Sequence, residues 1–367
     1  MTTYEIGDAE RVERTPLPPT RSRSDVLAGL RPVLGKHAGL LVAFVLVIAY
    51  FWATQPLFMT WSNISNLVAS NSVVLMLAIG ATFVIIAGGL DLSIVSATTL
   101  AGMCLGFMLT GGQPFAVGLL VVLLTGVVLG LVNGLLIAWG RMSFLVVTLG
   151  TMTIYASLAQ VSNEGATISV FSEPGFAPLM SFVTGELGPI PYIMIFDVVL
   201  ALLAGSVLRY TAYGRSLFAL GSNEEAARIN GINVTWTMLC TYMLAGLAAG
   251  IGALLQVGRL SGASATTDPT LLMAVLAAVL LGGTAFSGGE GGIFGTVLGV
   301  LFLGVITNGL TISQVSAFWT GTVNGGVLIL AVLISTGRNR GWFTRKPKTV
   351  ITGDQVIVAD PEPVGRH

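Results

Sequence analysis

The sequence predicts an all-α integral membrane protein with about ten transmembrane helices. Of its 367 residues, 54% are hydrophobic and only 9% are charged, and the mean hydropathy is +0.87. Soluble domains are about 25% charged. Between Gly39 and Ala138 the only charged residue is Asp91, whereas a soluble surface of that length needs many charges. The apolar runs do not alternate with polar residues, which argues against a β-barrel and for helices.

Ten apolar segments are long enough, or nearly long enough, to cross the hydrocarbon core of a membrane. Several are near the lower length limit, so the loops at Gly88–Asp91 and Gly282–Gly292 could dip into the membrane instead of clearing it. An eight-span alternative leaves two apolar stretches unexplained. In chain order the segments are 39–54, 66–88, 92–110, 115–139, 143–161, 190–208, 236–258, 269–286, 293–311 and 317–336.

The distribution of charge predicts the orientation. An even number of spans puts both termini on one side of the membrane. If that side is the cytoplasm, all of the 17 Lys and Arg residues except Arg259 lie inside. The positive-inside rule favours this arrangement. Four acidic residues then lie outside: Glu164, Glu173, Glu186 and Asp268.

The chain divides into a transmembrane domain and two tails. Residues 1–38 are polar, rich in Arg and Pro, and lack the apolar core of a signal peptide, so we expect a disordered cytoplasmic tail. Residues 39–337 form the transmembrane domain, and residues 338–367 form a second cytoplasmic tail. The 47 glycines of the chain favour close helix packing. No basic patch indicates nucleic-acid binding. Cys104 and Cys240 lie in apolar segments, where buried thiols are expected rather than a disulfide or metal site.

A polar segment at 209–235 interrupts the apolar sequence. Ser222 and Glu225 have the spacing of a capping box, which predicts a short helix beginning there. Gly231 is placed to end that helix in a left-handed conformation. The helix carries Glu224, Glu225 and Arg228 beside two small residues. It is either a solvated loop helix or a surface presented to a soluble partner.

We interpret two glycine-rich stretches as turns. In the first, Gly88 and Gly89 precede Asp91, which we expect to cap the next helix; an intramembrane acid can also serve a proton relay. The second begins at Gly282 and Gly283 and lacks the Gly-Lys-Ser/Thr ending of a phosphate loop, so we expect a compact cytoplasmic turn. The sequences from Val84 and from Val279 resemble each other. They suggest a parallel internal repeat, as in many transporters, although glycine-rich helices can mimic one.

Polar side chains within the spans either line a transport path or hydrogen-bond between helices. The candidates for the path are Asn71, Asn133, Gln256, Asn308 and Asn324, and Ser72 and Gln160 are also polar.

Four stretches carry a family resemblance: AGGLDLS at 87–93, FLVVTLGTMTI at 144–154, YGRSLFALGSNEEAARINGINV at 213–234 and AAVLLGGTAFSGGEGGIFGTVLG at 277–299. Together, from about Leu57 to Thr336, they resemble the ABC sugar permeases of the ribose-transport type, which are related to branched-chain amino-acid permeases. The resemblance implies a type II ABC importer fold in a bacterial inner membrane, with both termini cytoplasmic.

The resemblance also implies partners and roles. A cytoplasmic ABC ATPase with tandem domains would use ATP and Mg²⁺, a periplasmic or lipid-anchored sugar-binding protein would deliver a monosaccharide, and a second permease copy or paralogue would complete the path. This chain would hold no cofactor, metal or catalytic residue. The acidic outer loop 162–189 would meet the binding protein. The residues implied in ATPase coupling are Ser222, Asn223, Glu224, Glu225, Ala226, Ala227, Arg228 and Gly231.

Two other functions stay open. An ion- or proton-coupled secondary carrier needs ionisable residues in its spans, and the candidates are Asp91, Asp197 and Glu290. An ABC permease for branched-chain amino acids shares the same outline. A membrane sensor or scaffold for a cytoplasmic partner is a weaker third possibility.

Overall fold

The computed structural model describes residues 23–316, 318–339, 349–352 and 355–358. It contains two compact units, Met1–Ala38 and Gly39–His367. Helix α1 (Arg23–Thr54) runs through the boundary, so the segment expected to be a disordered tail is helical from Arg23 onward. The rest of that predicted tail lies outside the described residues.

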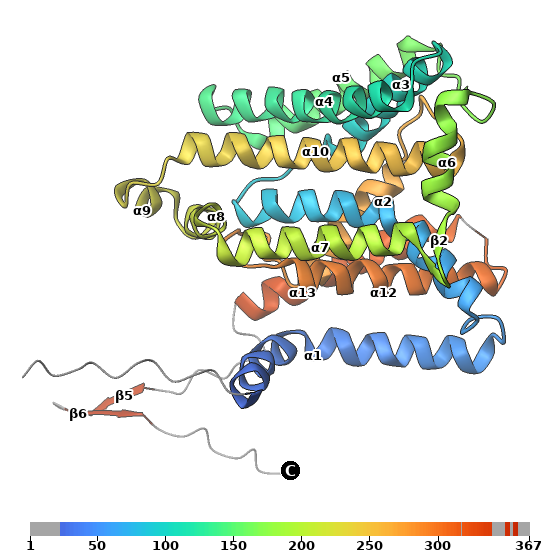
Figure 1. Cartoon of the computed structure of the whole chain (residues 1–367). Helices are drawn as coiled ribbons and strands as arrows, with labels where there is room; N and C mark the ends of the chain where they lie inside the picture. Colours follow the sequence, from blue (N-terminus) through green and yellow to red (C-terminus); the bar gives the residue numbers. More distant parts are fainter. Residues whose placement is uncertain (1–22, 317, 340–348, 353–354, 359–367) are drawn as a thin grey trace, which may run out of the picture. The chain divides into compact units, whose positions relative to one another are not determined.

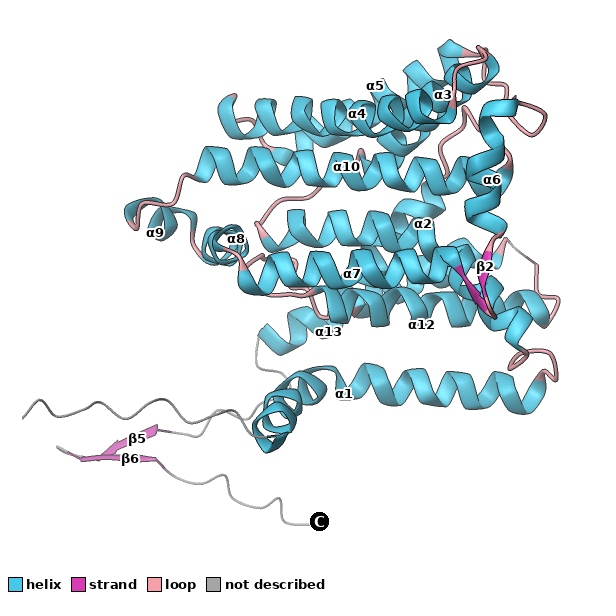
Figure 2. Ribbon diagram, in the orientation of Figure 1, coloured by secondary structure: helices cyan, strands magenta, loops and turns pink. Residues whose placement is uncertain are grey.

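The second unit is mainly helical (Figure 1; Figure 2). Its long helices are α2 (Trp61–Ile86), α3 (Ile94–Thr110), α4 (Phe115–Gly134), α5 (Phe144–Ser162), α7 (Tyr192–Tyr210), α10 (Val234–Leu260), α11 (Pro269–Leu281), α12 (Ile293–Ile312) and α13 (Trp319–Asn339). The π-helical turn η1 (Leu135–Trp139) continues α4. The short elements are β1 (Ile168–Ser169), η2 (Pro174–Phe176), α6 (Ala177–Thr184), β2 (Glu186–Leu187), β3 (Ile190–Pro191), α8 (Ala212–Ser222), α9 (Glu224–Ile229) and β4 (Gly262–Ala263).

The helices occupy the ten apolar segments expected from the sequence. Within the described part of the chain, seven helices are long and apolar enough to cross a membrane. The other three apolar helices are α3, α11 and the stretch Gly321–Leu330 of α13, which are shorter. A multispanning helical membrane protein is therefore confirmed, whereas the number of ten spans stays a prediction.

The C-terminal region differs from the expected disordered tail. Strands β5 (Thr349–Thr352) and β6 (Gln355–Val358) pair antiparallel, with Thr349 opposite Val358. Both strands are rich in β-branched residues, and the sequence between them is Gly-Asp. Such a pattern favours a hairpin, and the sequence-based prediction overlooked it.

Close packing of α10 against α4 depends on glycine. A methyl group on Gly130 of α4 would lie 2.2 Å from the carbonyl oxygen of Tyr242, and one on Gly246 of α10 would lie 2.2 Å from that of Gly126. Because neither helix has a side chain at these positions, the two backbones meet directly, as small residues permit in membranes. Helix α10 also packs against α2 and α3 and so occupies the interior of the bundle.

The largest buried cluster centres on α2, whose side chains are buried from Ser72 to Ile86 with one half-buried exception, Val74. Here α2 packs against α10, α12, α11 and α7. The Thr82 and Thr296 hydroxyls, on α2 and α12, form a buried hydrogen bond of 2.7 Å. A second cluster lies around α3, α6 and β4 and includes Phe176 and Leu179.

The two ends of the bundle carry different elements. Helices α8 and α9 connect α7 to α10 at one end, and α6 with the paired strands β2 and β3 lies at the other (Figure 1). Strand β1, in the loop after α5, pairs with β4, in the loop after α10. The segment 162–189 is therefore an ordered structure at the end opposite α9.

Candidate functional site: a charged helix, a glycine junction and a polar cavity

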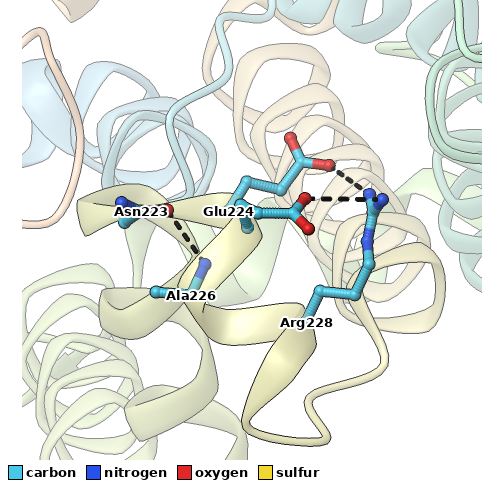
Figure 3. A network of polar contacts seen from close by, with 5 residues as sticks. Asn223, Glu224, Ala226 and Arg228 are labelled. Carbon is cyan, nitrogen blue, oxygen red and sulfur yellow. Dashed lines mark hydrogen bonds and ion pairs between the residues drawn. The ribbon is translucent and has the colours of Figure 1, made fainter.

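Helix α9 begins one residue later than the sequence suggested. Asn223 is the N-cap, and its side-chain oxygen accepts a hydrogen bond of 2.9 Å from the Ala226 amide (Figure 3). The predicted capping box at Ser222 and Glu225 is wrong. Helix α8 continues through Ser222, whose hydroxyl donates to the carbonyl of Phe218, and the chain turns extended only at Asn223. An N-cap needs that extended backbone, so Asn223 takes the role.

The end of α9 agrees with the prediction. Gly231 has a φ of +81°, a conformation that L side chains seldom adopt. Its amide donates to the Arg228 carbonyl at 3.0 Å, and the Ile232 amide donates to the Ala227 carbonyl at 3.1 Å. These bonds satisfy carbonyls at the helix end and redirect the chain toward α10.

The charged face of α9 is open to solvent. Arg228 lies 2.7 Å from a carboxylate oxygen of Glu224 and 3.8 Å from one of Glu225 (Figure 3). Such exposed pairs contribute little to stability, so the charges are available to a partner. Ile229 is 77% exposed, whereas Ala227 is 3% exposed and packs against the bundle. Ala227 therefore anchors α9, and it does not lie on the exposed face with the other residues of the predicted coupling set.

The end of α8 lies against both glycine turns. We call this contact the glycine junction: Ile86–Gly89, Gly221–Ser222 and Gly288–Gly289. The Gly289 amide donates to the Ile86 carbonyl at 2.9 Å, which joins the two turns directly. A methyl group on Gly221 would lie 1.8 Å from the Ile86 oxygen and 2.5 Å from the Gly289 nitrogen. The sequence analysis missed Gly221, because nothing in its own helix reveals a partner so distant in the chain.

The two turns end their helices in the same way. Three successive amides in each turn donate back to carbonyls four, three and five residues earlier. The donors are Ala87, Gly88 and Gly89 in the first turn and Gly282, Gly283 and Thr284 in the second. Gly88 and Gly283 have φ angles of +82° and +86°. The predicted turns are confirmed. The same bonding pattern with a positive φ also ends α3, α9 and α12, so it is a general helix ending in this chain and is not specific to the predicted repeat.

Asp91 stabilises the first turn but does not cap the next helix. Ser93 is the N-cap of α3, and Asp91 Oδ1 accepts from the Ser93 amide at 2.9 Å and from its hydroxyl at 2.6 Å. Asn133 donates to the same hydroxyl at 2.8 Å. Burial raises the pKa of the Asp91 carboxyl, and the hydrogen bonds from Ser93 oppose that rise. Asn133 therefore has a structural partner.

A cavity of about 360 Å³ lies between α2, α11, α12 and α13; its wall is mainly apolar, and we call it the polar cavity for the amides and hydroxyls that line the rest. It brings together three of the five predicted path residues, Asn71, Asn308 and Asn324. The other two, Asn133 and Gln256, do not line it. Its complete lining is Asn66, Leu67, Ser70, Asn71, Val74, Asp268, Thr270, Leu271, Ala274, Leu303, Gly304, Thr307, Asn308, Thr311 and Asn324.

Further candidate groups among the described residues are Asp197 and the two cysteines. Ser72 donates to the buried Asp197 carboxylate on α7. Cys104 and Cys240 are unpaired, half-buried thiols. Among the described residues, no group of three His, Cys, Asp or Glu side chains could hold a metal ion.

The fold and these features define a multispanning helical membrane protein. The chain belongs to the family described as the branched-chain amino acid transport system permease component, which matches residues 63–332.

Several curated relatives match nearly their whole length. The ribose import permease protein of Bacillus subtilis (strain 168) is 35% identical over 83% of this chain and 93% of its own. The D-allose transport system permease protein of Escherichia coli (strain K12) is 31% identical over 81% and 90%. The galactose/methyl galactoside import permease protein of Salmonella typhimurium is 31% identical over 82% and 94%. No solved structure gives a significant match.

Proposed function

We propose that this chain is the permease subunit of an ATP-driven importer of a monosaccharide, and that α9 receives the force of a separate ATPase. Membership of a permease family and the ribose, allose and galactose permeases among its relatives support this proposal. The expected setting is a bacterial inner membrane with both termini and α9 in the cytoplasm. The partners are a tandem-domain ATPase, a sugar-binding protein and a second permease subunit.

The observation that carries the proposal is the exposed charged helix. Helix α9 is capped at both ends and anchored by Ala227, so its backbone keeps one conformation while its outer face stays free. That face combines the Glu224, Glu225 and Arg228 charges with an apolar Ile229 side chain. A short helix with apolar and charged contacts suits a groove on a partner protein. The charged face of α9 does not pack against the bundle.

The glycine junction would transmit a displacement of α9 to the membrane-spanning helices. Helix α8 directly precedes α9, and the end of α8 contacts the turns that follow α2 and α11. Because all three segments meet backbone to backbone, they have no flexible side chain that could absorb a displacement. A shift of α9 would therefore move α2, α3, α11 and α12.

The first test is a pull-down of the tagged protein from detergent-solubilised native membranes, with the Glu225→Lys variant alongside. We expect the wild type to recover an ABC ATPase and a sugar-binding protein, and the variant to lose the ATPase. Glu225→Gln removes the charge without reversing it and should retain part of the recovery. Glu186→Lys reverses an exposed charge at the opposite end and should retain the ATPase.

Two results would contradict the proposal. Full ATPase recovery with Glu225→Lys would remove the role of α9. Failure of the wild type to recover any ATPase, together with uptake abolished by a protonophore, would favour a secondary carrier.

A further inference from the structure

We propose that the polar cavity between α2, α11, α12 and α13 is a transit site for a neutral, polyhydroxylated monosaccharide. The inference rests on the proposed function and deepens it by naming where the sugar is held within the permease.

The position of the cavity suits a substrate that arrives from the side opposite the ATPase. Its lining comes from the first half of α2, the start of α11, the second half of α12 and the start of α13. Because these helices alternate in direction, all four portions lie at the end away from α9. That end carries the loop 162–189, where the sugar-binding protein is expected to dock.

Asn324 gives the strongest sign of a missing ligand. Seven buried side-chain atoms of the described residues lack a hydrogen-bond partner, and the Oδ1 of Asn324, a residue only 4% exposed, is the one of them that belongs to the cavity lining. A buried polar atom without a partner is costly, so such atoms nearly always have one. A sugar hydroxyl in the cavity would donate the missing hydrogen bond.

The other two predicted path residues of the cavity, Asn71 and Asn308, are held in place by protein contacts. Asn308 and Asn63 exchange two hydrogen bonds, of 2.9 and 3.0 Å. Asn71 donates to the Leu67 carbonyl at 2.8 Å, and a methyl group on Gly304 would lie 2.5 Å from the Asn71 side chain. The absence of a side chain at Gly304 therefore leaves room for the Asn71 amide. These contacts fix two amides around the unpaired Asn324, which is the preorganisation a polar ligand requires.

The charge of the lining selects the ligand class. None of the lining residues is Lys or Arg, and the Arg259 guanidinium is bonded to the wall, where it donates to the Ser70 hydroxyl at 3.0 Å; no Lys or Arg side chain lines the cavity to pair with a phosphate or with the carboxylate of an amino acid. The single carboxylate, on Asp268, caps α11 by accepting from the Thr270 amide at 2.8 Å and from its hydroxyl at 2.7 Å. Amides and hydroxyls both donate and accept, as sugar hydroxyls do. This pattern favours a neutral sugar over a branched-chain amino acid.

The composition also predicts weak binding. No aromatic ring lines the cavity, so the stacking surface that strengthens many binding sites is missing. A site on a transport path must release its substrate as readily as it accepts it. A separate binding protein would capture the sugar, and the cavity would hold it only in passage.

A cysteine-protection experiment tests the site in native membranes that lack the sugar-binding protein. In a background with Cys104 and Cys240 replaced by Ser, Thr307→Cys places a thiol in the cavity, and Thr54→Cys places one on exposed α1 as the matched control. The probe solutes are D-ribose, D-galactose, D-allose and L-leucine. A sugar at about ten times its Kd should slow alkylation of the cavity thiol about tenfold and leave the Thr54→Cys thiol unaffected.

The outcomes separate the site from the function. Protection by leucine alone would overturn the sugar assignment. Absence of protection by every solute, in membranes whose wild-type complex imports one of these sugars with ATP, would overturn the site and leave the proposed function standing. Absence of any ATP-driven sugar uptake by the wild-type complex would overturn the proposed function itself.

A second variant tests Asn324 directly. Asn324→Leu keeps the side-chain volume and removes the polar atom, so we expect the maximal uptake rate to fall about tenfold, the effect of one hydrogen bond. The half-saturating sugar concentration should not change, because the binding protein sets it. Asn324→Ser restores an acceptor and should recover part of the rate. Wild-type uptake by Asn324→Leu, or an equal loss in protein abundance, would contradict the role.

Discussion

Replacing Gly221 by Ala tests the glycine junction most directly. In an ordinary helix this change stabilises the protein by about 1 kcal/mol, because alanine is the better helix former. At Gly221 the added methyl group would lie 1.8 Å from the Ile86 oxygen and 2.5 Å from the Gly289 nitrogen. Ordinary contacts begin at 3.4 Å, so backbone would have to move by more than 1 Å.

The magnitude follows from what that movement breaks. Overpacking costs about 1–3 kcal/mol. Loss of the hydrogen bond between Gly289 and Ile86 adds about 1 kcal/mol. After subtracting the helix gain, we expect Gly221→Ala to lower the free energy of unfolding by about 2 kcal/mol. Because the same contacts would transmit motion, sugar uptake should fall while ATPase binding to α9 persists.

The assay is thermal unfolding of the purified protein in detergent, with uptake measured in parallel. Gly205→Ala is the matched control, since it lies in the neighbouring helix α7 and its methyl group would meet only the Ile293 side chain, at 3.9 Å. We expect the control to be as stable as the wild type or slightly more so. Equal stability of Gly221→Ala and Gly205→Ala would refute the close contact described for the junction.

Three further substitutions have defined outcomes. Gly231→Val forces a β-branched residue to the positive φ that ends α9, so sugar uptake should fall and the local strain should be about 1–3 kcal/mol. Hydrogen exchange of the α9 amides measures this strain, and unchanged exchange would contradict the cap. Asn223→Ala removes the N-cap and should weaken α9 by about 1 kcal/mol, seen as faster exchange of the Ala226 amide. Gly130→Ala should destabilise the α4–α10 contact in a melting experiment, whereas Gly150→Ala, with open space around it, should not.

Local patterns in the sequence predicted the local structure. The apolar segments give the helices because a membrane-spanning backbone must satisfy its own hydrogen bonds. Gly231 was identified correctly because its conformation depends on the chain immediately around it. The N-cap of α9 was assigned to Ser222 instead of Asn223, since the sequence does not show that the Ser222 hydroxyl already bonds to α8.

Residues that act through distant contacts were harder to predict. The sequence supplied five polar candidates for a transport path, but only tertiary packing separates Asn71, Asn308 and Asn324 from Asn133. Among the described residues the Oδ1 atoms of Asn133 and Asn324 both lack a hydrogen-bond partner, but only Asn324 lines the cavity, whereas the Asn133 amide group donates to Ser93 away from it. The sequence around Gly221 does not predict that glycine is needed there, because the need comes from backbone atoms of two other turns.

The end of α8 is the place where, under the proposed function, a displacement of α9 would reach the bundle. The turns after α2 and α11 have the same hydrogen-bond pattern and the same positive φ at Gly88 and Gly283. The end of α8 contacts both glycine-rich stretches through Gly221 and Ser222, at Ile86–Gly88 in the first and at Gly288–Gly289 in the second. In the proposed mechanism a displacement of α9 would therefore reach α2 and α11 together. The α2 and α11 helices that it would move also form two walls of the polar cavity, so the same displacement would change the site where we propose the sugar is held.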